Sequence, residues 1–474
     1  MSHVPHCHDF QAGAKKALDD EHLQALLERT LKDGFQKKRV QGVSRLPEYD
    51  QLRDAARDLK NHVLDHLDMY LERFEIEVTK AGGHVHWARD AAEARDIILN
   101  ICRSVDAKTV SKGKSMIAEE IALNDHLEAN GIVPIETDLG EYIVQLRHEL
   151  PSHIIAPAFH ISKEQVADTF RENHTHLDPG RDLSEPTTLL TEARGELRDK
   201  FLQADVGITG ANILIAQTGT AMIVTNEGNG DLTQSLPPVH IAITSIEKVV
   251  PTLDDATLIL RLLARTATGQ EQSVYNTFFT GAKRPGDLDG PEQFHVVLLD
   301  NGRSELLGSE FRDILRCIRC GACINHCPVY GVTSGHAYGW VYPGPMGSVL
   351  TPHFVGIEEA HLLPSASTFC GRCEEVCPVR IPLPDLLRKW RVRAFNVGKP
   401  SGMARLALRA WAVLAQRPRL YRAVMGLAIG VLKLIAGRNG SLASLPGAGG
   451  WTKARDLPAP QGGTFQARYQ RGER

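Results

Sequence analysis

The sequence predicts an α/β body with a mostly parallel sheet, followed by a helical, cysteine-rich region and a basic helical tail. Three observations support this prediction. Short apolar runs alternate with helix-length amphipathic segments, seven of the nine cysteines lie between residues 317 and 377, and basic residues dominate the C-terminal region. The chain has 474 residues, 42% of them hydrophobic, which is enough for about two or three domains.

Residues 1–80 are predicted to form an N-terminal helical segment. Between residues 14 and 80, apolar side chains recur at intervals of three and four residues, the spacing that places them on one helix face. We expect two long helices here. The first ten residues lack the charged start and apolar run of a secretory signal, so a cytoplasmic location with reduced cysteines is expected.

Residues 81–305 are predicted to form the α/β body. The apolar runs that predict its first strands cover residues 84–88, 109–111, 132–136 and 154–156. Residues 205–248 are rich in β-branched side chains and glycines, which predicts short strands joined by tight turns. A helix over 254–266 and a strand over 295–299 are expected to complete the body.

Residues 306–395 are predicted to form a helical region that holds iron–sulfur clusters, entered through a capped helix over 309–317. Its first motif, Cys317-x-x-Cys320-x-x-Cys323-x-x-x-Cys327-Pro328, has the spacing of bacterial ferredoxins. Three thiolates at this spacing hold one cluster. The fourth is followed by a proline that ends the turn, so it serves a second cluster.

The second motif is Cys370-x-x-Cys373-x-x-x-Cys377-Pro378. Reciprocal exchange of the last cysteines assigns the ligands: Cys317, Cys320, Cys323 and Cys377 to cluster 1, and Cys327, Cys370 and Cys373 to cluster 2. The 42 residues between the motifs favour a helical ferredoxin-type domain. Zinc is the alternative metal, but it prefers two paired C-x-x-C knuckles.

Cluster 2 has only three thiolates from these motifs. Aligning the second motif on the first places Ser367 where a fourth cysteine would lie. This permits a [3Fe-4S] cluster, a [4Fe-4S] cluster with serine or water on one iron, or a ligand from elsewhere in the chain. We expect two iron–sulfur clusters, both [4Fe-4S] unless cluster 2 is [3Fe-4S].

Residues 396–474 are predicted to form a basic helical tail with a flexible end. Residues 388–474 hold 17 basic and two acidic residues, a net charge of +15, so the preceding residues carry −18 and the chain −3. That balance disfavours nucleic acid as a partner. Pro418 is expected to separate two amphipathic helices, which could pack on the acidic body or a dimer mate, on a partner subunit, or on an anionic membrane. The longest uncharged stretch of the apolar part between residues 403 and 436 is 423–432, which is too short to cross a bilayer.

The two cysteine motifs, read as Cys317–Tyr330 and Cys370–Pro382 beside an α/β body, resemble the lactate utilization iron-sulfur protein B family. Residues 111–121, 136–141 and 209–230 resemble its lactate-utilisation domain. The resemblance implies a body similar to the sugar-phosphate isomerase and CoA-transferase fold, and a cytoplasmic protein that oxidises L-lactate to pyruvate with companions of A and C type. It also implies that the second motif normally lacks the cysteine at 367.

Candidate ligand-binding residues in the body are less specific. Lys112 and Lys114 precede a helix expected near Ser115, where an anion would be favoured. Thr220 and Glu227 lie in glycine turns, and His240 lies at the start of a strand. Each is more often a turn or packing residue than a ligand. No G-x-G-x-x-G, Walker loop or H-E-x-x-H motif is present, which disfavours nicotinamide or flavin bound by this chain alone.

These features favour an electron-transfer subunit of a lactate-oxidising system that passes electrons through both clusters to an acceptor. Two other functions compete with it. The α/β body could be a transferase- or ligase-like enzyme with structural or regulatory clusters, or the chain could be a scaffold for its companions.

Overall fold

The computed structural model describes residues 4–437, 440–445, 452 and 455–472. Its contacts divide the chain into two units, Met1–Arg393 and Ala394–Arg474. The first unit contains both the sheet and the cysteines.

The N-terminal segment is helical, as predicted, but it is not built from two long helices. Its elements are η1 (Cys7–Asp9), α1 (Phe10–Leu18), α2 (Glu21–Leu27), the π-helical η2 (Glu28–Gln36), α3 (Lys37–Ser44), α4 (Tyr49–Asp65) and α5 (Leu67–Lys80). Two local features cause the breaks. The Asp20 side chain accepts a hydrogen bond from the backbone N–H of Leu23 and starts a new helix. Pro47 disfavours helical backbone at the preceding residue and separates α3 from α4.

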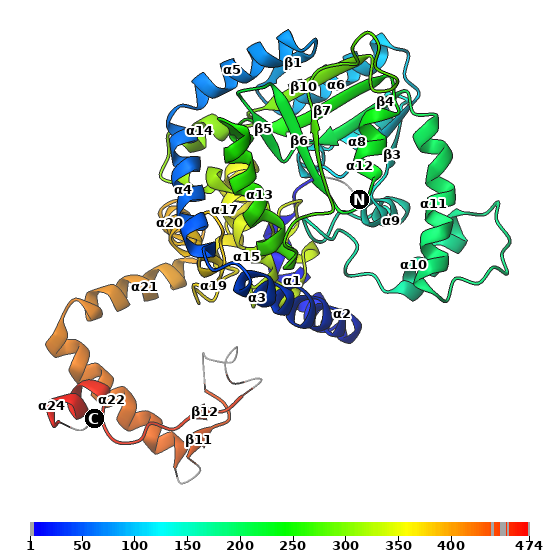
Figure 1. The fold of residues 1–474 in the computed structure, drawn as a ribbon. Coiled ribbons are helices and arrows are strands. Elements are labelled where there is room, and N and C mark those ends of the chain that lie inside the picture. The colour runs from blue at the N-terminus through cyan, green and yellow to red at the C-terminus, as the bar shows by residue number, and fades with distance from the viewer. Residues whose placement is uncertain (1–3, 438–439, 446–451, 453–454, 473–474) are drawn as a thin grey trace. The chain divides into compact units, whose positions relative to one another are not determined.

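The body is built on a six-stranded, wholly parallel sheet, which confirms the predicted fold class (Figure 1). In spatial order its strands are β1 (His84–Ala88), β10 (Gln293–Leu299), β7 (Val239–Ser245), β4 (Val206–Gly210), β2 (Thr109–Lys112) and β3 (Val133–Glu136). The strand predicted over 154–156 is wrong. These residues lie in an irregular loop whose backbone bonds to itself and whose Ile154 side chain is buried in the core that surrounds the cysteines.

Both faces of this sheet are covered, as a parallel sheet requires. Alternate side chains of β10, such as Val297 and Leu299, pack with α6 (Ala91–Ser104), α7 (Met116–Glu120) and α8 (Leu123–Ala129). The intervening side chains, such as Val296 and Leu298, pack with α5 and a second sheet. The remaining body helices are α9 (Leu139–Leu146), α10 (Lys163–Asn173), α11 (Pro186–Leu202), α12 (Asn229–Ser235) and α13 (Leu253–Thr268).

The second sheet has four strands in the order β8 (Val249–Val250), β5 (Ile213–Ile215), β6 (Thr220–Thr225) and β9 (Tyr275–Phe279). The expected tight turn joins β5 to β6 as an antiparallel hairpin. Gly219 makes the turn with a φ of +63°, and a Cβ there would lie 2.3 Å from the backbone nitrogen of Val78. Only glycine fits this close approach of the hairpin to α5.

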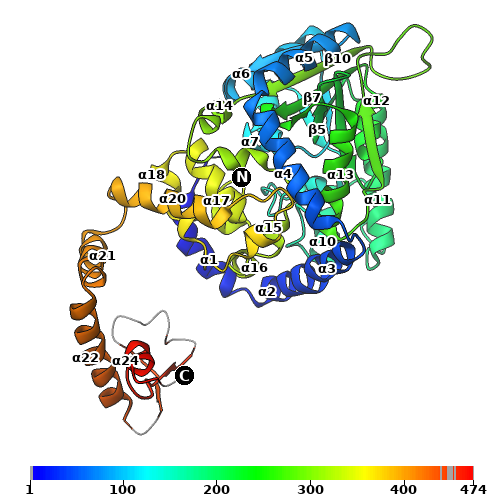
Figure 2. The same ribbon diagram turned by 60° about the vertical axis from the view of Figure 1, so that its left-hand side comes forward.

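The cysteine region is helical, as predicted (Figure 2). Its elements are α14 (Arg303–Leu307), η4 (Arg312–Arg316), α15 (Ala322–Asn325), α16 (Tyr330–Thr333), η5 (His336–Tyr338), α17 (Gly344–Phe354), α18 (Ile357–Ala360), η6 (Leu363–Ser365), α19 (Arg372–Glu375) and α20 (Leu383–Asn396). The single helix expected over 309–317 is wrong. The Ser309 hydroxyl accepts a hydrogen bond from the backbone of Phe311, and this turn leaves only the short helix η4 before Cys317.

The second unit contains α21 (Gly402–Ala415), α22 (Pro418–Ala436), β11 (Ser441–Leu442), β12 (Leu457–Pro458) and α24 (Phe465–Gln470). Pro418 separates the two long helices, as predicted. Within this unit Trp411 packs edge-on against Tyr421, but large apolar side chains such as Leu427 stay uncovered. None of the helices in the described residues is long and apolar enough to span a bilayer.

Candidate functional site

Four of the seven clustered cysteines surround one cavity. Its walls contain the sulfur-bearing side chains of Cys317, Cys320, Cys323 and Cys377. The rest of the lining is mostly apolar, and includes Ile154, Ile318, Met346, Val379 and Leu383. Burial raises the pKa of Cys320 to about 12, so this thiol would stay protonated without a metal to stabilise the thiolate. The donor set and the dry enclosure suit an iron–sulfur cluster.

The other three cysteines, Cys327, Cys370 and Cys373, form a second group. Electrostatic repulsion from Cys327 and Cys370 adds to burial in raising the pKa of Cys373 to about 12. Cys370 itself is exposed. Cys323 of the first group feels the charge of Cys373 in the second, so the two groups are neighbours. The ligand set of each individual cluster stays a prediction.

Left-handed backbone turns bring the thiols together. Arg319 and Gly321 flank Cys320 with φ angles of +59° and +72°, and Gly321 starts α15. The backbone N–H of Arg319 donates to the Cys317 sulfur at 3.4 Å. Hydrogen bonds of this kind favour the thiolate and so favour metal binding.

Cationic side chains reach the backbone beside the cluster 1 cysteines. Arg53 donates to the carbonyl oxygen of Cys377 at 2.8 Å, and Lys248 donates to that of Cys317 at 3.2 Å. Both side chains come from outside the cysteine region, on α4 and at the end of the short helix η3 (Ile246–Lys248). Positive charge near a cluster stabilises its more negative, reduced state.

A second, larger cavity of about 280 Å³ lies at the carboxyl edge of the parallel sheet. Residues that follow β2, β3 and β4 line it, among them Lys114, Asp138 and Asn212. Ligands of open α/β sheets bind at this edge. The cavity also reaches Arg319, Cys320 and Tyr342 of the cysteine region. The two cavities share three lining residues, Ile154, Arg319 and Cys320, so a wall one residue thick separates them.

Of the body residues singled out from the sequence, Lys114 and Glu227 line this larger cavity. The other three make contacts elsewhere, which sequence spacing did not indicate. The Lys112 ammonium is fully buried against Glu119 and Glu136, at 3.1 and 2.7 Å.

Thr220 bonds to the hydroxyls of Thr218 and Thr280 in the second sheet. His240 shares a 2.8 Å hydrogen bond with the Thr209 hydroxyl and packs between Phe279 and Phe294. Burial lowers its pKa to about 3, so the ring is neutral near pH 7. The sequence analysis did not single out other cavity residues, such as Asn229 and Tyr342; Asn229 lies in the segment 209–230 noted for its resemblance, and Tyr342 lies outside any recognisable motif.

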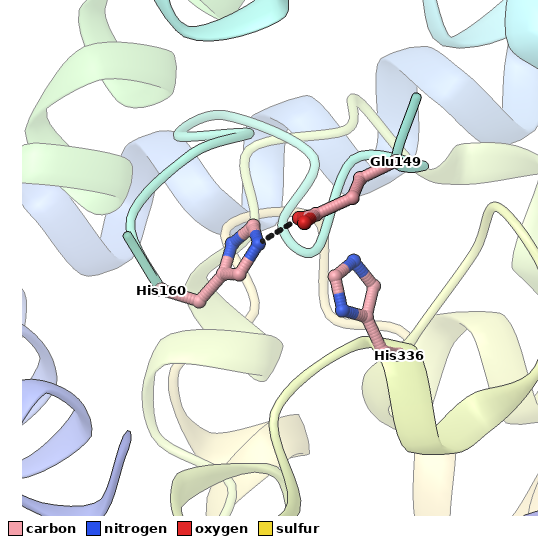
Figure 3. Close-up of side chains that lie close together, drawn as sticks. All are labelled: Glu149, His160 and His336. Carbon is pink, nitrogen blue, oxygen red and sulfur yellow. Dashed lines mark hydrogen bonds and ion pairs between the residues drawn. The ribbon is translucent and has the colours of Figure 1, made fainter. Parts of the chain in front are cut away.

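A polar network also joins the 147–160 loop of the body to the cysteine region. Glu149, His160 and His336 point toward one another in Figure 3. His160 bonds to Glu149 at 2.9 Å, and Arg147 pairs with the same carboxylate at 2.9 Å. The His336 ring bonds to the carbonyl oxygen of Leu150 at 2.8 Å. Because the Glu149 carboxylate already pairs with Arg147, we interpret these contacts as structural: they hold the 147–160 loop in place.

Comparisons with known proteins agree with this division of the chain. Residues 71–299 match the LUD domain, residues 313–381 match the 4Fe-4S dicluster domain, and residues 384–474 match the lactate utilisation protein B C-terminal domain. The chain is 41% identical over 460 residues to Lactate utilization protein B of Bacillus licheniformis, covering 96% of this chain and 95% of that protein. It is 40% identical over 465 residues to the protein of the same name from Bacillus subtilis, with the same coverage.

Among solved structures, a DUF162 family protein from Deinococcus radiodurans aligns with 49% of this chain and 98% of its own, at 13% identity and a TM-score of 0.27.

Proposed function

This chain belongs to the lactate utilization protein B family and carries two iron–sulfur clusters, and from that premise we propose that it is the electron-transfer subunit of a system that oxidises L-lactate to pyruvate. Bound clusters would supply one-electron transfer. The chain's own residues would bind them, set their potentials and keep water away from cluster 1.

One observation carries the proposal: the sheet-edge cavity touches Cys320 of the first group, and Cys370 of the second group is exposed. Electrons delivered at the cavity would enter cluster 1 through its buried side. Because Cys323 and Cys373 interact, cluster 2 is the next acceptor. Cluster 2 would then pass electrons to an acceptor docked near Cys370.

We propose that the chain works in the cytoplasm with companion proteins of A and C type and with a separate electron acceptor. Its C-terminal unit offers these partners a basic surface with uncovered apolar side chains, including Leu427 and Leu434. The same surface would suit the anionic face of a membrane.

Metal analysis and EPR of anaerobically purified protein test the proposal. We expect about eight irons and eight sulfides per chain, and a reduced-cluster signal that appears on L-lactate addition only when the companions are present. Cys320→Ser should abolish both the lactate-dependent signal and growth on lactate. Cys102→Ser, which alters a buried cysteine in the core beside the sheet, is the matched control and should retain both.

The rival functions give different results. A scaffold would still support growth on lactate after Cys320→Ser. A transferase- or ligase-like body would turn over a CoA ester or sugar phosphate without any change in the EPR signal.

A further inference from the structure

The cavity at the sheet edge contains a cation that is not bonded directly to another side chain. The Lys114 ammonium makes no hydrogen bond or ion pair with any of the described residues, although its charge opposes the rise that burial causes in the pKa of Glu227, which lines the same cavity. The other two cations in the lining are engaged: Lys248 donates to the Cys317 carbonyl, and Arg319 pairs with Glu247 at 3.7 Å while lying over the Tyr342 ring. Lys114 is therefore the lining cation available to an anion.

The same cavity contains an unsatisfied acceptor. The side-chain oxygen of Asn229 is buried and lacks a hydrogen-bond partner among the described residues. A buried acceptor left unpaired is unfavourable, and a ligand carrying an O–H group would satisfy it. Asp138 does not compete for the cation, because its carboxylate accepts the backbone N–H groups of Gly140 and Glu141.

We infer that this cavity binds a small hydroxycarboxylate, whose carboxylate pairs with Lys114 and whose hydroxyl donates to Asn229. The inference rests on the proposed function, and it places the organic acid in the chain that holds the clusters. The cavity volume is about 280 Å³, several times the roughly 30 Å³ that one water molecule occupies in the liquid. It therefore accommodates a three-carbon acid together with ordered water. The bound acid lies against the wall formed by Ile154, Arg319 and Cys320.

Calorimetric titration of the full-length holoprotein with L-lactate and with pyruvate, without companions, tests this. Lys114→Met should weaken both ligands about tenfold or more, since a charge-assisted contact is lost. Asn229→Ala should weaken L-lactate at least threefold and leave pyruvate within about twofold, because only lactate has the donor hydroxyl. Lys108→Met, at the exposed amino end of the same strand, is the matched control and should bind both as wild type does.

The results separate this inference from the proposed function. Wild-type protein that has its clusters and accepts electrons from the companions, but binds neither acid, overturns the cavity assignment and leaves the electron-transfer function standing. Wild-type affinity in Lys114→Met, or binding of phosphate-bearing ligands alone, also overturns it. If both acids bind but lactate does not reduce the clusters even with the companions present, the cavity assignment is supported and the proposed electron transfer is refuted.

A second inference, carried by a different observation, concerns the missing ligand of cluster 2. The two cysteine motifs adopt the same backbone. Phe369 and Gly371 flank Cys370 with φ angles of +55° and +81°, and α19 begins directly after Gly371, as α15 does after Gly321. In the first motif the N–H of Arg319 donates to Cys317; in the second, the N–H of Phe369 donates to the Ser367 hydroxyl oxygen at 3.1 Å.

Ser367 Oγ thus occupies the place in the second motif that Cys317 Sγ occupies in the first. We propose that Ser367 is the fourth ligand of cluster 2. On binding, its hydroxyl would release a proton to solvent, and the Oγ–iron bond would replace water or hydroxide on that iron.

Iron content and EPR of the oxidised protein test this assignment. In Ser367→Ala the iron content should fall from about eight to about seven per chain, and an oxidised three-iron signal should appear. Ser367→Cys should keep about eight irons and show an altered EPR spectrum in the reduced state. Ser365→Ala, which removes an exposed hydroxyl two residues before Ser367, is the control and should match wild type. An oxidised three-iron signal in wild type, or eight irons with an unchanged spectrum in Ser367→Ala, overturns the assignment.

Discussion

Replacing Arg303 by methionine should destabilise the first unit strongly, because it leaves the buried Glu120 carboxylate without its cation and removes one of the two arginines that pair with Glu247. The Arg303 guanidinium is 1% exposed. It pairs with both oxygens of Glu120, at 2.9 and 2.7 Å, and with Glu247 at 3.1 Å. Removing one member of a buried charge network costs about 3–5 kcal/mol. That is a large fraction of the roughly 5–15 kcal/mol that stabilises a typical fold.

The assay is urea unfolding of the anaerobic holoprotein, followed by far-UV circular dichroism. Arg89→Met, which breaks an exposed pair with Glu93, is the control and should cost under about 1 kcal/mol. Adding Glu120→Gln to Arg303→Met should recover part of the loss, since one uncompensated charge is then removed. A loss below about 1 kcal/mol in Arg303→Met would refute the argument that this network holds the body to the cysteine region.

Three further predictions concern other contacts. Burial opposes ionisation of Glu149, but hydrogen bonds from His160 and Arg147 lower its pKa to about 2. Its contribution to stability should therefore be complete above the unfolded pKa of about 4.3 and be lost as pH falls toward 2; thermal melts of Glu149→Gln should lack this acid-side dependence. Gly335→Ala should lower the melting temperature, because a Cβ there would lie 1.8 Å from the Ser152 carbonyl oxygen, whereas Gly228→Ala, with open space around it, should not. Charge reversal on α22 should reduce co-purification of the companions at low salt, and an unchanged yield would exclude the basic face as their contact.

Most strands of the parallel sheet could be predicted from the sequence, because short runs of apolar and β-branched residues are a local signal of buried strands. The prediction failed over 154–156, where three apolar residues suited a strand equally well. Those residues pack against the cysteine core, a tertiary contact that no local pattern encodes. The helix expected over 309–317 failed for a different reason: a serine read as a helix cap instead caps a turn.

The candidate site also has a part that could be predicted from local sequence and a part that could not. The gathering of the cysteines could be predicted because ferredoxin chemistry imposes fixed spacing along the chain. Of the cavity residues, only Lys114 and Glu227 were singled out, because the lining gathers from strand ends and from the cysteine region. Lys112 and Lys114 are two residues apart, yet one is buried among carboxylates and the other faces the cavity. Alternation alone would place both on one face, but the strand ends at Lys112, so Lys114 lies beyond it at the sheet edge, and the sequence did not show where the strand would end.

The 147–160 loop connects these parts, because it builds the wall between ligand and cluster. Its Ile154 lines both cavities, and its position depends on contacts on either side. His153 bonds to Asn325 on α15 at 2.8 Å, and the Tyr330 hydroxyl donates to the Ser152 carbonyl at 2.7 Å. A change that loosens these contacts should alter how a bound acid affects the cluster 1 spectrum without altering iron content. The effect of a bound acid on cluster 1 would therefore depend on the 147–160 loop of the body as well as on the cysteines.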